Sequence, residues 1–213
     1  MLERTRLLLA TNNKGKIREY KSLLRDIPFE MVAPAELGIS IEVEETGSSF
    51  EENARLKAVT LANQSRLAAL ADDSGLEVDA LGGEPGPFSA RYAGEGASDT
   101  DRIKFLLSKL QNVPAAKRTA RFRCVIAIAA PSGLSLRGAK RRGNLTPSVK
   151  IFSGECRGII IDTPRGNNGF GYDPIFFIPE LGKTMAELTL EEKNRVSHRS
   201  KAAEKAREWL GKI

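Results

Sequence analysis

The chain has 213 residues and carries 33 Lys and Arg against 27 Asp and Glu, so its formal net charge is +6. With 41% hydrophobic and 28% charged residues, its composition is that of a globular protein, which excludes a disordered chain. The longest strongly apolar stretch, 125–130, is too short to cross a bilayer, so we expect no membrane association. At this length we expect one domain over residues 1–213.

The hydrophobic pattern alternates between strand and helix signals. Short apolar runs predict strands, and apolar residues three or four positions apart predict helices. In chain order we expect a strand at 6–11, a helix that includes 17–24, a strand at 29–33, a helix at 49–65, a strand at 68–71, a helix at 99–110, strands at 121–130, 149–152, 158–161 and 173–178, and two helices after 189 and 197. Several late strands follow one another without a helix, which predicts an α/β fold with a twisted mixed β-sheet and flanking helices.

The two cysteines and the first residues indicate a compartment. Cys124 and Cys156 suit free thiols in a reducing environment better than a disulfide scaffold. The N-terminal residues mix charges with only a brief apolar run, so we expect no signal peptide. Together these features predict a cytoplasmic protein.

The positive charge is concentrated in one segment. Residues 115–165 hold 11 basic and two acidic residues, so this segment carries +9 and the rest of the chain −3. Such a segment leaves open a basic nucleic-acid-binding domain. That function favours interleaved aromatic residues, and only Phe122 and Phe152 lie in the segment. We interpret Lys140-Arg141-Arg142 as a solvated turn and expect no stable nucleic-acid partner.

A polar run follows the first predicted strand and precedes a helix. The unpaired N–H groups at a helix start bind phosphate, a glycine there allows close approach, and a lysine adds a full charge. A polar turn in which Asn acts as the helix N-cap is the equally weighted alternative. The residues of the run are Thr11, Asn12, Asn13, Lys14, Gly15 and Lys16.

Two acidic clusters provide candidate metal ligands. Glu42, Glu44 and Glu45 precede a Thr-Gly pair, and Asp72-Asp73 follow the buried strand 68–71, which we expect to end there. Mg²⁺ is commonly held by one or two carboxylates together with phosphate oxygens. If the strand pleat continued through the aspartates, their side chains would point in opposite directions. A solvated acidic turn is the alternative.

The loop 166–174 reads Gly-Asn-Asn-Gly-Phe-Gly-Tyr-Asp-Pro. Its glycines allow a tight turn that could present Phe170 to a base, and such stacking is worth about 1–3 kcal/mol. Tyr172 could stack as well or could equally belong to the core. Asp173 is held extended by the proline after it and could accept a hydrogen bond from a base N–H. A structural glycine-rich loop is the alternative.

Isolated candidates lie elsewhere in the chain. Lys57 follows Asn53 by four residues, so both lie on one helix face, where a lysine could meet phosphate or solvent. His198 is the only histidine, and no His or Cys cluster accompanies it that would form a zinc site. Arg199 stands at a predicted helix start and carries fixed donors for a carbonyl or a phosphate.

Taken together, these motifs resemble the inosine triphosphate pyrophosphatase family. The matching stretches are LLLATNNKGKIREYKSLL, EETGSSFEENARLKA, ALADDSGLEVDALGGEPGPFSARYAGE and PRGNNGFGYDPIFFIPELGKTMAELTLEEKNRVSHR. They occur in the family's order and spacing and extend to Arg199, which is nearly the whole chain. The resemblance implies two α/β lobes with the active-site cleft between them, usually in a homodimer.

The resemblance also implies a reaction, in which Mg²⁺-dependent hydrolysis between the α- and β-phosphates yields a nucleoside monophosphate and pyrophosphate. The implied substrates are non-standard purine nucleoside triphosphates: dITP, ITP, XTP and dXTP. Carried over residue by residue, Glu45 and Asp73 match the metal ligands, and Asp73 also matches the general base. Lys57 matches a substrate-contacting position, where its charge would assist catalysis.

The remaining implied roles concern substrate binding. The run from Thr11 to Lys16 matches the triphosphate loop, and Ser74 matches a further substrate contact. The base-stacking and base-reading positions match Phe170, Gly171, Tyr172 and Asp173, while contacts that favour a 6-keto purine match Lys193, His198 and Arg199. Donors facing the 6-carbonyl would reject adenine, because its amino group would oppose one donor with another. A pyrophosphatase for modified pyrimidine nucleotides is the alternative within the same chemistry.

Overall fold

The structure is a computed structural model that describes residues 5–40, 43, 46–132 and 148–213. Glu42, Glu44 and Glu45 lie outside the described residues, and so does the basic run Lys140-Arg141-Arg142. The predicted metal-ligand role of Glu45 and the predicted solvated turn therefore stay predictions.

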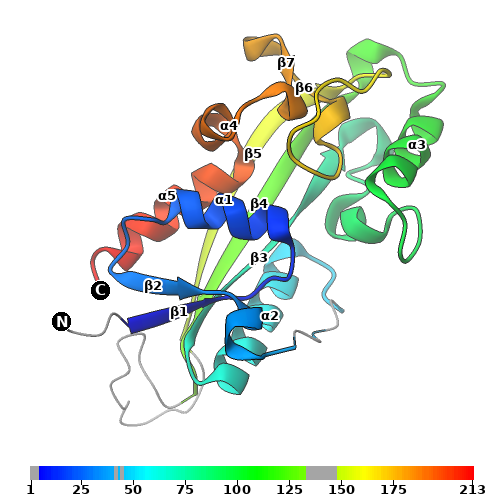
Figure 1. The fold of residues 1–213 in the computed structure, drawn as a ribbon. Coiled ribbons are helices and arrows are strands. Elements are labelled where there is room, and N and C mark those ends of the chain that lie inside the picture. The colour runs from blue at the N-terminus through cyan, green and yellow to red at the C-terminus, as the bar shows by residue number, and fades with distance from the viewer. Residues whose placement is uncertain (1–4, 41–42, 44–45, 133–147) are drawn as a thin grey trace. The chain divides into compact units, whose positions relative to one another are not determined.

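The described strands form one seven-stranded sheet in the order β2-β1-β3-β4-β5-β6-β7 (Figure 1). Strand β1 runs parallel to both β2 and β3, whereas β6 is antiparallel to β5 and β7. This arrangement confirms the predicted mixed α/β sheet. The strand bounds are Thr5–Leu9 (β1), Phe29–Val32 (β2), Ala68–Val78 (β3), Thr119–Ala129 (β4), Val149–Ile160 (β5), Phe176–Ile178 (β6) and Lys183–Thr184 (β7).

Side-chain caps determine where most of the helices begin. Asn13, Ser49, Ser98 and Thr189 each accept a hydrogen bond from a backbone N–H of the first turn, which satisfies a donor that the helix itself leaves unpaired. No helix among the described residues is long and apolar enough to cross a membrane. The helix bounds are Lys14–Leu23 (α1), Phe50–Ser65 (α2), Asp99–Leu110 (α3), Leu190–Val196 (α4) and His198–Leu210 (α5).

Three strand predictions were wrong. In the predicted strand 173–178 only Phe176–Ile178 is a strand, and Asp173–Ile175 form a 3-10 turn, so Asp173 is not extended as the sequence predicted. Strand β3 does not end at Asp72 but continues to Val78, because the side chains of Asp72 and Asp73 find cationic partners on the helices. The predicted strands 149–152 and 158–161 are one strand, β5. Its middle keeps a period of two, with Cys156 buried between the exposed Glu155 and Arg157, so these charges mark a solvated sheet face and not a break.

The described chain divides into two compact units. Unit 1 comprises Met1–Asp73, Val125–Ser153 and Ala202–Ile213, and unit 2 comprises Ser74–Cys124 and Gly154–Lys201. The chain passes between them inside β3, β4, β5 and α5. The expected single functional domain and the expected cleft between two lobes stay predictions.

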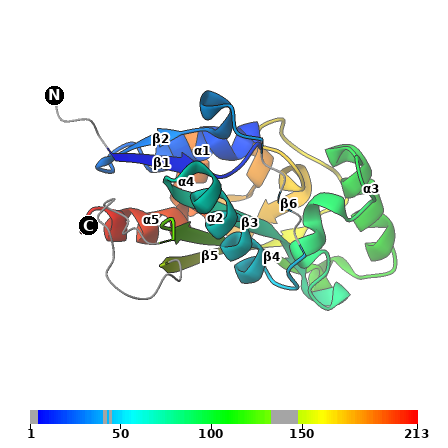
Figure 2. The same cartoon turned by 90° about the horizontal axis from the view of Figure 1, so that it is seen from below.

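In unit 1, α2 covers one face of the strands with small side chains. Ala54, Ala58 and Ala62 belong to a buried cluster with Leu8, Ala69 and Ala71 of the sheet. Figure 2 shows α2 in front of the strands in that view. Because side chains alternate along a strand, Asp73 lies on the same face of β3 as Ala69 and Ala71.

In unit 2, α3 packs with larger side chains. Ile103, Leu106 and Leu110 belong to a buried cluster with Leu76 of β3 and Phe122 of β4. These three helix residues lie three and four positions apart, which confirms the apolar face that the sequence predicts for 99–110.

Candidate active site

The polar run before α1 is built around a capped helix start. The Asn13 side chain accepts a hydrogen bond from the Lys16 N–H at 3.1 Å, and the Asn13 N–H donates to Thr11 Oγ1 at 3.2 Å. The N-cap interpretation is therefore confirmed. It does not exclude an anion site, because a capped helix start still carries the positive end of the helix dipole. Asn12 and Lys14 are exposed, while Thr11, Gly15 and Lys16 are half-buried.

Each aspartate of β3 pairs with a lysine from a different helix. Lys16 Nζ of α1 lies 2.8 Å from Asp72 Oδ1, and Lys57 Nζ of α2 lies 3.2 Å from Asp73 Oδ1. The strand pleat continues through both residues, so adjacent carboxylates reach opposite faces, as the sequence allowed. A buried carboxylate needs such charge compensation, since an isolated one costs several kcal/mol to desolvate.

Asn53 joins Asp73 to the loop that precedes α2. Its Nδ2 donates to Asp73 Oδ2 at 3.2 Å, and its Oδ1 accepts from the Gly47 N–H at 2.8 Å. A Cβ at Gly47 would lie 2.6 Å from that Oδ1, so only glycine fits this approach. Asn53 and Lys57 thus hold the two Asp73 oxygens from successive turns of α2. Our sequence interpretation gave Asn53 no role of its own, although its spacing from Lys57 signalled a shared face.

Unit 2 holds a second polar group around the start of α5. Arg199 is buried, and its Nη2 donates to Ser74 Oγ at 2.8 Å. The His198 ring stacks on Phe122 of β4 with 4.8 Å between centroids. Ser197 caps α5 by accepting from the Ser200 N–H at 3.1 Å, which agrees with the predicted helix start and points the first residues of α5 toward these partners.

The glycine-rich loop is closed by Asp173. One of its oxygens, Oδ2, accepts from the Phe170 N–H at 3.0 Å and pairs with Lys193 Nζ of α4 at 2.6 Å. Gly169 has φ +78°, and a Cβ there would lie 2.0 Å from the same oxygen. The loop conformation therefore requires glycine at this position. Asp173, which the sequence offered as a base acceptor, also braces the loop and holds Lys193.

The Phe170 ring lies near two cations. Lys193 Nζ is 5.1 Å and the Arg199 guanidinium carbon 5.6 Å from its centroid, distances at which a ring face attracts positive charge. Phe170 is half-buried, so part of its ring is accessible to a ligand. Tyr172 instead belongs to the core of unit 2, and its hydroxyl donates to the Ser89 carbonyl at 3.0 Å. Burial raises the pKa of this phenol above its usual range.

The basic segment is partly neutralised where the structure describes it. Arg121 Nε lies 2.6 Å and Arg123 Nη1 3.2 Å from the carboxylate oxygens of Glu77, and Arg118 pairs with Asp162. Glu77 lies outside the segment 115–165, so its negative charge was not counted in the net charge of +9 for that segment. Within the described part of the segment, these paired arginines therefore do not form the uncompensated basic face that a nucleic-acid-binding domain needs.

The structure thus gathers the predicted residues into two groups. In unit 1, Lys16 and Lys57 meet Asp72 and Asp73, while in unit 2, Phe170, Asp173, Lys193 and Arg199 surround one loop and His198 lies beside Phe122. The chain passes from one unit to the other between Asp73 and Ser74. Among the described residues no group of three metal-ligating side chains occurs.

Lysines beside buried carboxylates suit the stabilisation of phosphate charge, and a half-buried aromatic ring suits stacking on a base. These features fit an enzyme that acts on a phosphorylated ligand carrying a base. The chain belongs to the Ham1 family, which it matches over residues 7–209, and this confirms the predicted resemblance.

Relatives and solved structures agree with this assignment. The chain is 52% identical to the dITP/XTP pyrophosphatase of Geobacter sulfurreducens, over 97% of each chain. It is 43% identical to the dITP/XTP pyrophosphatase of Bacillus subtilis, over 95% of this chain and 96% of that one. A HAM1 protein from Coxiella burnetii superimposes with a TM-score of 0.84 at 41% identity, over 98% of this chain and all of the other.

Proposed function

We propose that this protein hydrolyses non-standard purine nucleoside triphosphates (dITP, ITP, XTP and dXTP) to the nucleoside monophosphate and pyrophosphate. The observation that carries the proposal is the buried carboxylate of Asp73, whose two oxygens are held by Asn53 and Lys57. Ser74, the next residue, accepts a hydrogen bond from Arg199. The relatives named as dITP/XTP pyrophosphatases support the same reaction.

The reaction is an in-line attack of water on the α-phosphorus. Asp73 takes the water proton, a bond forms between the water oxygen and phosphorus, and the bond to the α–β bridging oxygen breaks. Pyrophosphate leaves with the electron pair of that bond. Lys57 and Lys16, together with the N–H groups at the start of α1, stabilise the charge on the phosphate oxygens.

We further propose Mg²⁺ as the cofactor, with Asp73 and Glu45 as its protein ligands. The donor set fits: Mg²⁺ prefers carboxylate oxygens, commonly takes one or two of them, and completes its octahedron with water and substrate phosphates. A cluster of three protein ligands is therefore not required. When bound, the ion lowers the pKa of the attacking water and screens phosphate charge.

The groups in unit 2 supply base selection in this proposal. Phe170 stacks on the purine, while Lys193, His198 and Arg199 provide donors for a 6-keto oxygen. Asp173 keeps Lys193 in place through its 2.6 Å ion pair. An adenine amino group would face those donors with another donor, and a buried unpaired polar group costs about 1–3 kcal/mol.

A nucleotide panel tests the proposed function. With Mg²⁺, the purified protein should release pyrophosphate from ITP, dITP and XTP at a kcat/KM about 10–100-fold above that for ATP, as one or two mismatched polar groups predict. Pyrophosphate and orthophosphate are quantified separately. Release of single orthophosphates, or a preference for modified pyrimidine nucleotides, would contradict the proposal.

Assembly and location complete the proposal. We propose a homodimer, as the resemblance to the family implies, and light scattering after gel filtration measures its mass.

We propose a cytoplasmic location, and the two buried free cysteines, Cys124 and Cys156, support it. Burial raises the pKa of the Cys156 thiol to about 11, so this thiol is protonated at neutral pH and reacts slowly with oxidants.

A further inference from the structure

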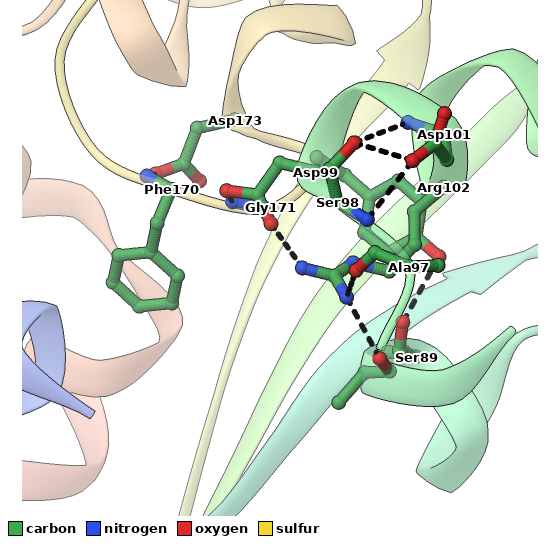
Figure 3. A network of polar contacts seen from close by, with 11 residues as sticks. Ser89, Ala97, Ser98, Asp99, Asp101, Arg102, Phe170, Gly171 and Asp173 are labelled. Carbon is green, nitrogen blue, oxygen red and sulfur yellow. Dashed lines mark hydrogen bonds and ion pairs between the residues drawn. The ribbon is translucent and has the colours of Figure 1, made fainter. Parts of the chain in front are cut away.

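The glycine-rich loop has a second carboxylate contact that comes from helix α3 (Figure 3). Asp99, the first residue of α3, accepts a hydrogen bond from the Gly171 N–H at 2.7 Å through its Oδ2. Asp173 accepts from the preceding N–H, that of Phe170. Two consecutive loop amides are therefore held by two carboxylates from different elements.

Arg102 fixes the orientation of the Asp99 carboxylate. Its Nη2 pairs with Asp99 Oδ1, while its Nη1 donates to the carbonyls of Ala97 at 2.6 Å and Ala90 at 2.9 Å. An exposed ion pair usually contributes little because both side chains must be ordered for it. Here the guanidinium is already ordered by two backbone carbonyls, so the carboxylate has a rigid support.

The helix start beneath Asp99 is rigid as well. Ser98 caps α3, and Asp101 closes a capping box by accepting from the Ser98 N–H at 3.1 Å. The Ser98 contacts lower the pKa of Asp101, so its carboxylate is ionised at neutral pH, the form that accepts these hydrogen bonds. The carboxylate of Asp99 lies in the first helical turn, where the helix dipole favours negative charge.

The backbone of the loop that receives this contact depends on such hydrogen bonds for its conformation. Gly169 and Gly171 both have positive φ, +78° and +63°, and glycine has more conformational freedom to lose than any other residue. Phe170 lies between them, so the place of its ring depends on how the two flanking amides are held. Asn168, which donates to the Leu188 carbonyl, and the Tyr172 hydroxyl, bonded to the Ser89 carbonyl, anchor the loop on either side of these two amides.

We propose that Asp99 is a positioning residue for base binding: by holding the Gly171 N–H it keeps the Phe170 ring at the place where a purine stacks. This inference rests on the proposed function of Phe170. It assigns Asp99 to recognition of the base and not to the handling of phosphate, because its contact lies in the loop and not at Asp73 or Lys57.

The test measures base binding without turnover. In the full-length protein, Asp99→Ala should weaken the binding of inosine monophosphate about tenfold by calorimetry, because a misplaced ring loses most of the stacking contribution. Inhibition by inorganic triphosphate, which carries no base, should stay unchanged. For ITP, KM should rise while kcat stays nearly constant. Asp99→Asn, which keeps an oxygen acceptor for Gly171, should recover most of the binding.

Asp101→Asn is the matched control, because it weakens the cap of the same helix turn without touching the loop. It should leave inosine monophosphate binding unchanged.

A double-mutant cycle adds a signature that general destabilisation would not give. In a Phe170→Leu background, Asp99→Ala should change the binding of inosine monophosphate by less than about twofold, since both substitutions act through one ring. If Asp99→Ala folds poorly, Arg102→Met tests the same support and should weaken binding by about threefold.

The outcomes separate this inference from the proposed function. Suppose that the wild type hydrolyses ITP and that Asp99→Ala and Arg102→Met both bind inosine monophosphate as tightly as the wild type does. That result would overturn the positioning role alone. An equal loss of inorganic triphosphate inhibition would overturn it as well. A wild-type protein that binds inosine monophosphate without releasing pyrophosphate from ITP would overturn the proposed reaction, and the binding comparison would still decide the role of Asp99.

Discussion

The polar groups of the two units differ in how they balance charge. In unit 1, each buried carboxylate of β3 meets one lysine: Asp72 meets Lys16, and Asp73 meets Lys57. In unit 2, Asp173 pairs with Lys193 and, with Asp99, accepts hydrogen bonds from backbone amides of the glycine-rich loop. The buried Arg199 donates to the neutral Ser74 hydroxyl and lies beside the Phe170 ring.

This difference suits two tasks. Matched carboxylate–lysine pairs provide both a base and cations at a reacting phosphate, where charge develops during the reaction. An aromatic ring beside hydrogen-bond donors suits a neutral base with a carbonyl oxygen, whose charge does not change. We therefore expect substitutions in unit 1 to lower turnover for every nucleotide, and substitutions in unit 2 to change the preference among nucleotides.

The largest expected effect is that of Asp73→Asn. The amide has the same shape but accepts a proton poorly, so kcat should fall at least about 10³-fold. If unit 1 serves the phosphates alone, the loss is equal for ITP, XTP and ATP. Steady-state kinetics for the three nucleotides measure this, and circular dichroism checks the fold.

Asp79→Asn is the matched control for this substitution, because Asp79 is exposed and contacts Thr119 and Arg121 instead of the proposed site. It should keep wild-type kcat. Near-normal turnover of Asp73→Asn would remove Asp73 from the role of general base. A loss that differs strongly between nucleotides would show that the two tasks are not divided as we propose.

A smaller and different effect is expected for Phe170→Leu. Leucine preserves an apolar contact but removes the aromatic face, so KM for ITP should rise about tenfold, in line with stacking worth about 1–3 kcal/mol. Turnover at saturation should change little, and inhibition by inorganic triphosphate should not change. Equal effects on inorganic triphosphate and ITP would contradict a role confined to the base.

The smallest expected effect concerns the support of α4, which carries Lys193. Glu192 pairs with Lys183 at 2.9 Å and closes the cap at Thr189. The Lys183 contact first, and then the Thr189 N–H, lower the pKa of Glu192 to about 2 from 4.5. A lowered folded-state pKa contributes stability above the unfolded-state value, and this contribution is lost as pH falls through the folded value.

Glu192→Gln should therefore lower the melting temperature modestly at pH 7. The difference from the wild type should shrink below about pH 4.5 and approach zero only below about pH 2, where Glu192 is also protonated in the folded state. Calorimetric scans across this range measure it. A constant difference at all pH values would indicate that the pair contributes through packing and not through charge.

Local patterns made much of the fold predictable. Ser49, Thr189 and Ser197 cap the helices that the sequence assigned to them, because capping depends on residues only three positions apart. The buried face of α3 follows from the spacing of its apolar residues for the same reason. The identity of the family was also available from short motifs in order, as the match over residues 7–209 shows.

Contacts between distant segments decided the rest. Asp72 and Asp73 looked like the end of a strand because two adjacent aspartates are unfavourable inside a sheet, yet Lys16 and Lys57 compensate their charges from two different helices. Tyr172 could have stacked on a base or packed in the core, and the Ser89 carbonyl, 83 residues away, gave its hydroxyl a buried partner.

The sequence alone determined most of the helix starts and the α/β class, because these depend on short-range spacing. The tertiary structure decided which polar groups pair with each other, including the hydrogen bonds from the Gly47 N–H to Asn53 and from the Gly171 N–H to Asp99. The physical reason is that a buried polar group is stable only beside its partner, and folding brings that partner from a distant part of the chain.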